Sequence, residues 1–279
     1  MKKPKKDVKK AAPGKIRVSG ALDSNPFIED VDLKAAWERE YRTRWTSPAM
    51  AISVPTGFGA DWGALYLGTS FYNRTQFSQI ADGAAFFGTG IGDATKNLGI
   101  EVTLSVVNLD PFAQDMALSG KIHRSLGKGF GISLGAENAL IVAGDGIDQT
   151  QNYYVAVSKF ISLKDSEMLP MSQLLLSVGA GNGRFTNATT LAQAKNNYRP
   201  FGSIGLRALP WLGIAGAWTG RDVDLGVSAA PFRSFRLTIT AGVHDVANLA
   251  NRPRAFSLTF AYGESFFSDT FPFFTVKSL

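Results

Sequence analysis

The feature that most constrains this chain is an alternation of apolar and polar residues that recurs along most of its length. In residues 98–107, for example, Ile100, Val102 and Leu104 alternate with Glu101 and Thr103. Because successive side chains of a β-strand point to opposite faces, this period of two predicts strands with one apolar and one polar face. It predicts twelve strands, at 62–72, 82–92, 98–107, 115–124, 129–137, 151–161, 170–180, 200–208, 211–219, 222–229, 234–243 and 255–263.

The predicted strands and their connections have the dimensions of a membrane barrel. Most of the strands have nine to eleven residues, about the length that a tilted strand needs to cross a bilayer. Connections after odd-numbered strands are mostly long and those after even-numbered strands mostly short, as in outer-membrane barrels. We therefore predict an all-β fold, an antiparallel up-and-down transmembrane β-barrel of about twelve strands.

The two faces of the predicted strands favour a membrane barrel over a soluble sandwich. One face consists almost entirely of Leu, Ile, Val, Phe and Ala, whereas the other is rich in Gly, Ser and Thr with scattered charges. A face exposed to water would normally carry more Lys, Glu and Arg. Small inward residues instead suit a lumen that holds water, a loop or a helix. A soluble β-sandwich or barrel remains the alternative, because its sheets alternate in the same way.

The composition excludes several kinds of site. The chain has no Cys, which excludes a disulfide scaffold, a Cys nucleophile and Cys-ligated zinc or iron–sulfur centres. His123 and His244 are its only two His, which argues against a multi-His metal site. No run approaches about 18 consecutive apolar residues, so no membrane-spanning helix is predicted. We expect neither a cofactor nor a metal.

The N-terminal region differs from the predicted barrel. Its first 17 residues contain eight Lys or Arg and one Asp, so they carry a charge of +7, whereas the rest of the chain carries −1. We predict a disordered basic tail at 1–26, with no nucleic-acid partner because no aromatic residue is interleaved with its lysines. The basic start resembles a signal-peptide n-region, but Ala11–Gly14 replaces the apolar core. Either a leader precedes this start or export follows another route.

An amphipathic helix is predicted between the tail and the barrel. Its apolar stripe recurs every four residues over 27–46 and consists of Leu33, Trp37, Tyr41 and Trp45. The helix could plug the lumen, lie at the membrane interface or pack against the barrel end. The barrel then occupies 47–264, followed by an aromatic-rich extension at 265–279. Residues 47–61 and 264–279 could each add a strand.

Charged side chains are predicted on the lumen face of the strands. These residues are Glu101, Lys121, His123, Glu137, Arg207, Asp222, Asp224 and Arg236. They form either a charge ring that sets the ion preference of the channel or a paired network that stiffens the barrel wall. Their near balance predicts no strong ion selectivity. The group Asp222, Asp224, His244 and Asp245 loosely resembles the two acidic pairs of the omptin outer-membrane proteases. An outer-membrane phospholipase would need a paired Ser and His; the chain has many Ser, but no motif selects one.

Two segments carry a resemblance to a known class of protein. Residues 56–63 (TGFGADWG) and 90–101 (GIGDATKNLGIE) resemble uncharacterised porin-like outer-membrane barrels of cyanobacterial type, and the resemblance covers about 47–264. It implies the bacterial cell outer membrane, with lipopolysaccharide or another outer-leaflet lipid around the barrel. We expect a channel for passive diffusion of small polar solutes, not an enzyme, and leave a homo-oligomer open. The alternatives are a plugged or closed barrel with a structural or assembly role, then a barrel hydrolase, then a soluble β-rich structural protein.

Overall fold

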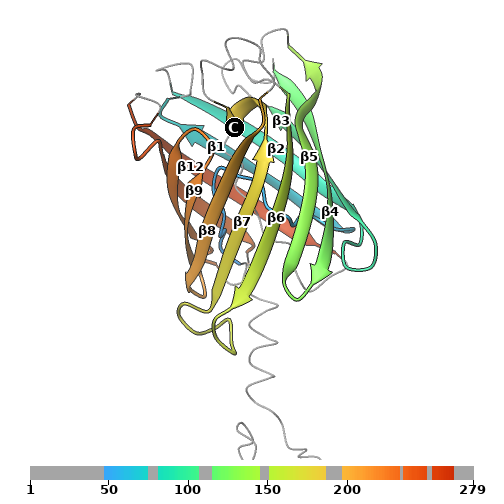
Figure 1. Ribbon diagram of the computed structural model, residues 1–279, viewed down its shortest axis with the longest axis vertical. Coiled ribbons are helices and arrows are strands. Elements are labelled where there is room, and N and C mark those ends of the chain that lie inside the picture. Colours follow the sequence, from blue (N-terminus) through green and yellow to red (C-terminus); the bar gives the residue numbers. More distant parts are fainter. Residues whose placement is uncertain are drawn as a thin grey trace, which may run out of the picture. The chain divides into compact units, whose positions relative to one another are not determined.

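The computed structural model describes residues 47–74, 81–106, 115–144, 151–186, 197–232, 235–249 and 253–266. These residues form one closed barrel of twelve antiparallel strands (Figure 1). The strands are β1 (Ala64–Tyr72), β2 (Asp82–Gly92), β3 (Gly99–Val106), β4 (Met116–Gly127), β5 (Phe130–Ala143), β6 (Asn152–Ser162), β7 (Gln173–Gly181), β8 (Arg199–Leu209), β9 (Leu212–Trp218), β10 (Val223–Ala229), β11 (Leu237–His244) and β12 (Ala255–Ser265). A short 3-10 helix, η1 (Gly183–Phe185), follows β7.

Each strand pairs with the next one along the chain, and β1 pairs with β12 to close the barrel. The closing register places Ala64 opposite Ser265 and Tyr72 opposite Ser257. This topology confirms the predicted up-and-down barrel of twelve strands. The strand that differs most is β5, which runs past its predicted end at 137. Its pairing with β4 is irregular between Leu118 and Gly120, and Asn138, with a φ of 51°, interrupts the alternation there.

The connections give the barrel two different ends. The short-turn end carries the connections 93–98, 128–129 and 210–211, whereas the long-loop end carries 73–81, 107–115, 144–151, 182–198 and 245–254. Two connections depart from this division: a tight turn joins β9 and β10 at the long-loop end, and a longer connection, 163–172, joins β6 and β7 at the short-turn end. The barrel therefore has one compact end and one with extensive loops.

The barrel wall is apolar outside and polar inside. Along β5 and β7, outward-facing Leu134 and Val178 are 61% and 63% exposed, while their inward neighbours Ser133 and Ser177 are both 2% exposed. A soluble barrel buries its apolar face instead. The predicted assignment of faces is therefore confirmed.

Residues 47–61 lie inside the barrel, and we call them the lumen strap (Figure 1, blue trace). The sequence left open whether they add a strand; they form none of the twelve wall strands, because the wall begins at Ala64. Ile52 and Val54 of the strap pack against Tyr154 and Phe185, so this apolar cluster lies within the lumen.

Several expectations concern residues outside the described part. The basic tail at 1–26 and the helix at 27–46, with its stripe Leu33, Trp37, Tyr41 and Trp45, lie there, as does the extension at 265–279 apart from Ser265 and Phe266. Ser265 belongs to β12. Within the described ranges, no helix has both the length and the hydropathy needed to cross a membrane.

Candidate functional site

The first limb of the lumen strap begins near the short-turn end. The Ala49 amide donates a hydrogen bond to Ser228 Oγ on β10, at 2.9 Å. The carbonyls of Ala49 and Met50 lie against Gly213 of β9 and Gly205 of β8. Each of these wall positions lies close to the β8–β9 turn or to the end of β10. The strap is therefore anchored on this side of the wall at the short-turn end.

The strap reverses direction around Ser53, toward the long-loop end. Ser53 has a φ of 60°, a left-handed conformation suited to a reversal. Its carbonyl accepts a 2.6 Å hydrogen bond from Arg184 Nη1 of η1, and its hydroxyl lies 3.5 Å from His244 Nδ1 at the end of β11. Arg184 is held in turn by Glu137 of β5, at 2.6 Å. The apex is thus fixed from opposite sides of the barrel.

The second limb returns along the other side of the wall. The Thr56 carbonyl accepts a hydrogen bond from Ser133 Oγ of β5, and the Gly57 amide donates to Ser158 Oγ of β6, both at 2.8 Å. Beyond the strap, the Trp62 amide donates to the Gly92 carbonyl at the end of β2. Both limbs therefore open toward the short-turn end, and the strap forms a re-entrant loop.

Glycines on the inner wall make room for the strap. A Cβ on Gly205 would lie 1.7 Å from the Met50 carbonyl oxygen, and one on Gly131 of β5 would lie 2.5 Å from the Phe58 ring. Other inner glycines accommodate aromatic rings: Gly88 faces Tyr66, Gly135 faces Tyr154 and Gly179 faces Phe201. The small inward residues of the sequence thus accommodate a loop of the same chain and neighbouring rings.

Three of the predicted lumen charges meet beneath the second limb. Lys121 Nζ of β4 forms a 2.9 Å ion pair with Glu101 of β3, and both side chains are less than a tenth exposed. Lys121 also donates to the Phe58 carbonyl, while Glu101 accepts from the Ala60 amide. His123 Nε2 donates to the Ala60 carbonyl at 3.0 Å. These charges therefore bind the strap's backbone as well as each other.

The other five predicted lumen charges belong to separate ion pairs, one of them between Asp224 and His244 at 2.9 Å. Arg207 pairs with Glu167 at 3.0 Å, Arg236 with Glu264 at 3.2 Å, Glu137 with Arg184 at 2.6 Å and Asp222 with Arg221 at 3.0 Å. The eight residues are distributed among clusters toward both ends of the barrel. Their effect on ion preference stays a prediction.

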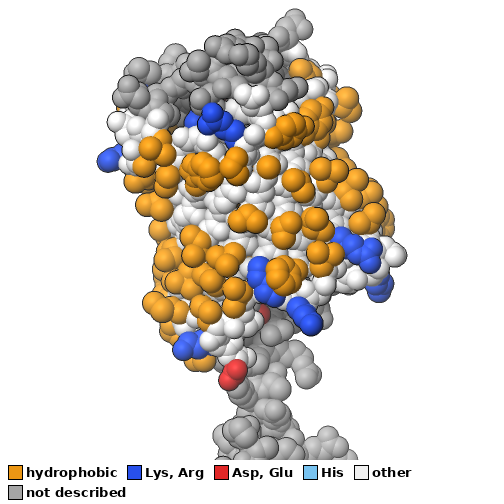
Figure 2. Space-filling view, in the orientation of Figure 1, with side chains coloured by type: hydrophobic (Ala, Val, Ile, Leu, Met, Phe, Trp, Pro, Cys, Tyr) orange, Lys and Arg blue, Asp and Glu red, His pale blue; other side chains and the backbone are white. Residues whose placement is uncertain are grey.

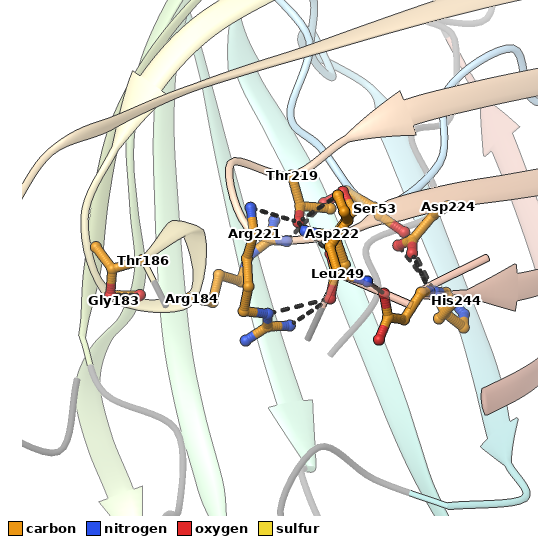
Figure 3. Close-up of polar contacts among 11 residues, drawn as sticks. Ser53, Gly183, Arg184, Thr186, Thr219, Arg221, Asp222, Asp224, His244 and Leu249 are labelled. Carbon is orange, nitrogen blue, oxygen red and sulfur yellow. Dashed lines mark hydrogen bonds and ion pairs between the residues drawn. The ribbon is translucent and has the colours of Figure 1, made fainter. Parts of the chain in front are cut away.

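At the long-loop end, the group Asp222, Asp224 and His244 is divided. Asp222 binds Arg221 and accepts a hydrogen bond from Thr219, whereas Asp224 Oδ2 lies 2.9 Å from His244 Nδ1 (Figure 3). Thr219 and Arg221 lie in or beside the tight turn between β9 and β10. Asp222 is therefore occupied by its own turn, and only Asp224 contacts the histidine.

Sequence reasoning missed the residue on the other side of this histidine. His244 Nε2 lies 2.8 Å from Ser257 Oγ of β12, so a serine, a histidine and an aspartate lie in one hydrogen-bonded series. Ser257 stands in an ordinary alternating strand with no local motif. Only the register of β12 against β11, which places Ser257 opposite Gly242, could have selected it.

The described residues contain no cluster of three or more His, Asp or Glu side chains suited to a metal ion.

Comparisons with known proteins give similarities to solved structures alone. No family model matches the chain, and no curated protein matches it. Among solved structures, the chain is similar to a KdgM porin in complex with disordered oligogalacturonate. That similarity has a TM-score of 0.43 and 12% sequence identity, and it covers 71% of this chain and 98% of that one. The resemblance to barrels of cyanobacterial type stays a prediction.

Proposed function

We propose that this protein spans the bacterial outer membrane as a porin-like barrel that the lumen strap holds closed. Displacement of the strap then opens a channel for passive diffusion of small polar solutes. The observation that carries the proposal is the burial of the strap against inner wall residues from β2 round to β11.

The outer surface supports a bilayer location. Large apolar side chains on it are widely exposed, and Figure 2 shows them spread over the visible face of the barrel, with Lys and Arg toward its upper and lower margins. Trp211 and Trp218, beside and within β9 at its two ends, are 39% and 44% exposed, where interfacial aromatic residues of a membrane barrel lie. Apolar surface of this extent marks a membrane or protein interface. The surrounding partner in this proposal is a bilayer with lipopolysaccharide or another outer-leaflet lipid.

The attachment of the strap supports its displacement. The wall is held by continuous backbone ladders, but the strap is held mainly by individual side chains that bind its backbone, such as Ser228, Ser158 and Lys121. Each such hydrogen bond contributes about 0.5–1.5 kcal/mol net, and more where a charged group takes part. The strap can therefore leave without breaking the wall. The vacated lumen would expose Gly, Ser, Thr and paired charges, which water can hydrate, together with the rings of Tyr154 and Phe185.

A disulfide lock tests the proposal. Because the natural chain has no Cys, Ala49→Cys and Ser228→Cys together introduce a single pair of thiols, where the Ala49 nitrogen and Ser228 Oγ lie 2.9 Å apart. We expect the purified protein in a planar bilayer to show no steps when oxidised and discrete openings when reduced. The two single Cys variants are the controls, and they should respond to neither treatment. Equal currents in the oxidised and reduced states would overturn the proposal.

A permanently plugged barrel with a structural or assembly role is the second candidate. It is favoured by the depth of the strap's burial, since residues 48–57 are all buried. Heat-modifiable gel migration shows that the double variant is folded, and protease protection shows that it is inserted. If this folded and inserted protein passes no current after reduction, a plugged barrel is favoured over a channel.

A further inference from the structure

A hydrogen-bonded group of three side chains lies in the lumen beside the apex of the strap, and the channel proposal does not use it. It consists of Asp224, His244 and Ser257 on the neighbouring strands β10, β11 and β12. His244 Nδ1 lies 2.9 Å from Asp224 Oδ2, and His244 Nε2 lies 2.8 Å from Ser257 Oγ. Both distances fall within the range that links a nucleophile, a general base and an orienting acid.

The strands and one glycine hold this arrangement in place. The register sets Ser257 directly opposite Gly242, and His244 follows two residues later on the same face of β11. A Cβ on Gly242 would lie 2.6 Å from Ser257 Oγ and 3.2 Å from His244 Nε2. The hydrogen bond between serine and histidine therefore depends on the missing side chain at 242.

The acid is fixed more firmly than the other two residues. Asp224 is 4% exposed in its side chain and its Oδ1 accepts the Asp245 amide at 3.0 Å, while the His244 side chain is 13% exposed. Ser257 is only partly buried. The Tyr72 ring lies beside the imidazole at a tilt of 42°, with centroids 6.0 Å apart. A buried acid thus holds a partly buried histidine within hydrogen-bond reach of a partly buried serine, which is the arrangement of an activated serine nucleophile.

We propose that Ser257, His244 and Asp224 form a catalytic triad that hydrolyses small carboxylic esters in the barrel lumen. Ser257 is the nucleophile and His244 the general base. Asp224 accepts a hydrogen bond from the Nδ1–H group and so holds the tautomer in which Nε2 accepts the serine proton.

The reaction runs in two balanced halves. Ser257 Oγ attacks the ester carbonyl carbon and its proton passes to His244 Nε2. The carbon–oxygen bond to the alcohol then breaks, and the alcohol leaves with that proton. In the second half, water attacks the acyl–Ser257 carbonyl and gives a proton to Nε2. The bond to Oγ breaks, Oγ recovers the proton, and the carboxylic acid is released.

The direction of the serine defines the class of substrate. Its strand neighbours Phe256 and Leu258 face outward, at 54% and 40% exposure, so Ser257 faces the lumen. The site lies at the end of β11 that leads into the connection 245–254, on the long-loop side. A water-soluble ester small enough to enter at that end fits this position, whereas the acyl chain of a bilayer lipid would meet the opposite face of β12.

The proposal is tested on full-length protein in detergent, which makes it independent of any channel current. A fluorophosphonate probe loses fluoride as its phosphorus bonds to an activated serine oxygen, and peptide mass spectrometry locates the label. We expect labelling at Ser257, together with hydrolysis of p-nitrophenyl acetate above the buffer rate. Ser257→Ala should lose both, and Asp224→Asn should reduce hydrolysis by about a hundredfold or more.

Two further variants separate catalysis from folding. Gly242→Ala retains all three residues but turns the serine hydroxyl away from the histidine, so it should fold, by heat-modifiable migration, and lose labelling. Ser70→Ala removes another inner serine, which bonds the Thr259 hydroxyl at 2.8 Å, and it should label as the wild type does. Folded wild-type protein that lacks either the label at Ser257 or the hydrolysis would overturn the proposal. Full activity of Ser257→Ala would overturn it as well.

Discussion

Replacement of Gly205 by alanine should open the barrel by displacing the first limb of the strap. The added Cβ would lie 1.7 Å from the Met50 carbonyl oxygen, whereas carbon and oxygen atoms in contact lie about 3.3 Å apart. Gly205 itself is fixed between two strands, opposite Leu175 on β7 and Ala215 on β9. The strap backbone must therefore move, by roughly 1.6 Å if it moves directly away.

This displacement has a calculable effect on the closed state. Overpacking of a well-packed interior costs about 1–3 kcal/mol. Because the wall ladders remain intact, we expect this cost to fall on the closed, strap-bound state. At about 1.4 kcal/mol per factor of ten, the ratio of open to closed barrels should rise roughly 5- to 150-fold.

The assay is the open probability of single channels in a planar bilayer, with heat-modifiable gel migration as the test of folding. Gly120→Ala is the matched control, because a Cβ on Gly120 of β4 would meet nothing within 4 Å. We expect it to behave as the wild type. A folded, inserted Gly205→Ala protein with the wild-type open probability would refute the inference that the strap closes the barrel.

Three further predictions test the wall and the charges beneath the strap. Leu134→Arg, on the outer face of β5, should destabilise the barrel in bilayers by about 2–4 kcal/mol, whereas Leu126→Arg beside the β4–β5 turn should cost far less, as measured by denaturant titration in vesicles. Lys121→Met leaves the buried Glu101 carboxylate without its 2.9 Å partner and should cost about 3–5 kcal/mol; adding Glu101→Gln should recover part of this loss in a double-mutant cycle. Burial raises the pKa of Asp61 above its ordinary value of 3.8. The protonated Asp61 carboxyl therefore contributes to stability below pH 3.8, and this contribution is lost as the pH rises through the raised pKa. Asp61→Asn should therefore remove this loss from the pH–stability profile, and an unchanged profile would contradict the assignment.

The twelve strands and their two faces followed from local pattern. The period of two in a strand such as β3 depends only on neighbouring residues, and the lengths of the connections are visible directly in the chain. The bulge near Asn138 was harder to predict. The partner of the bulged strand, which the local pattern does not contain, determines where its register shifts.

The segment that fills the lumen could not be predicted from the local alternation of residues. Residues 47–61 have an unremarkable composition, and their role depends on wall glycines such as Gly205 and Gly213, more than 150 positions away. Seven of the eight predicted lumen charges are buried, but the sequence did not identify their partners. Arg184, which fixes both Glu137 and the strap apex, lies outside the strands and carries no periodic signal.

The sequence by itself thus determined the class of fold, the number of strands, and which side chains face inward. Tertiary structure alone decided what fills the barrel and which polar groups meet. Ser53 and His244 approach each other across 191 residues of chain, and Ser257 meets His244 only because β11 and β12 pair in one register. The alternation of apolar and polar residues indicates which face of the sheet a side chain points to. Barrel closure and strand register fix which other side chain lies in that direction, because they set distances between residues that are remote in the chain.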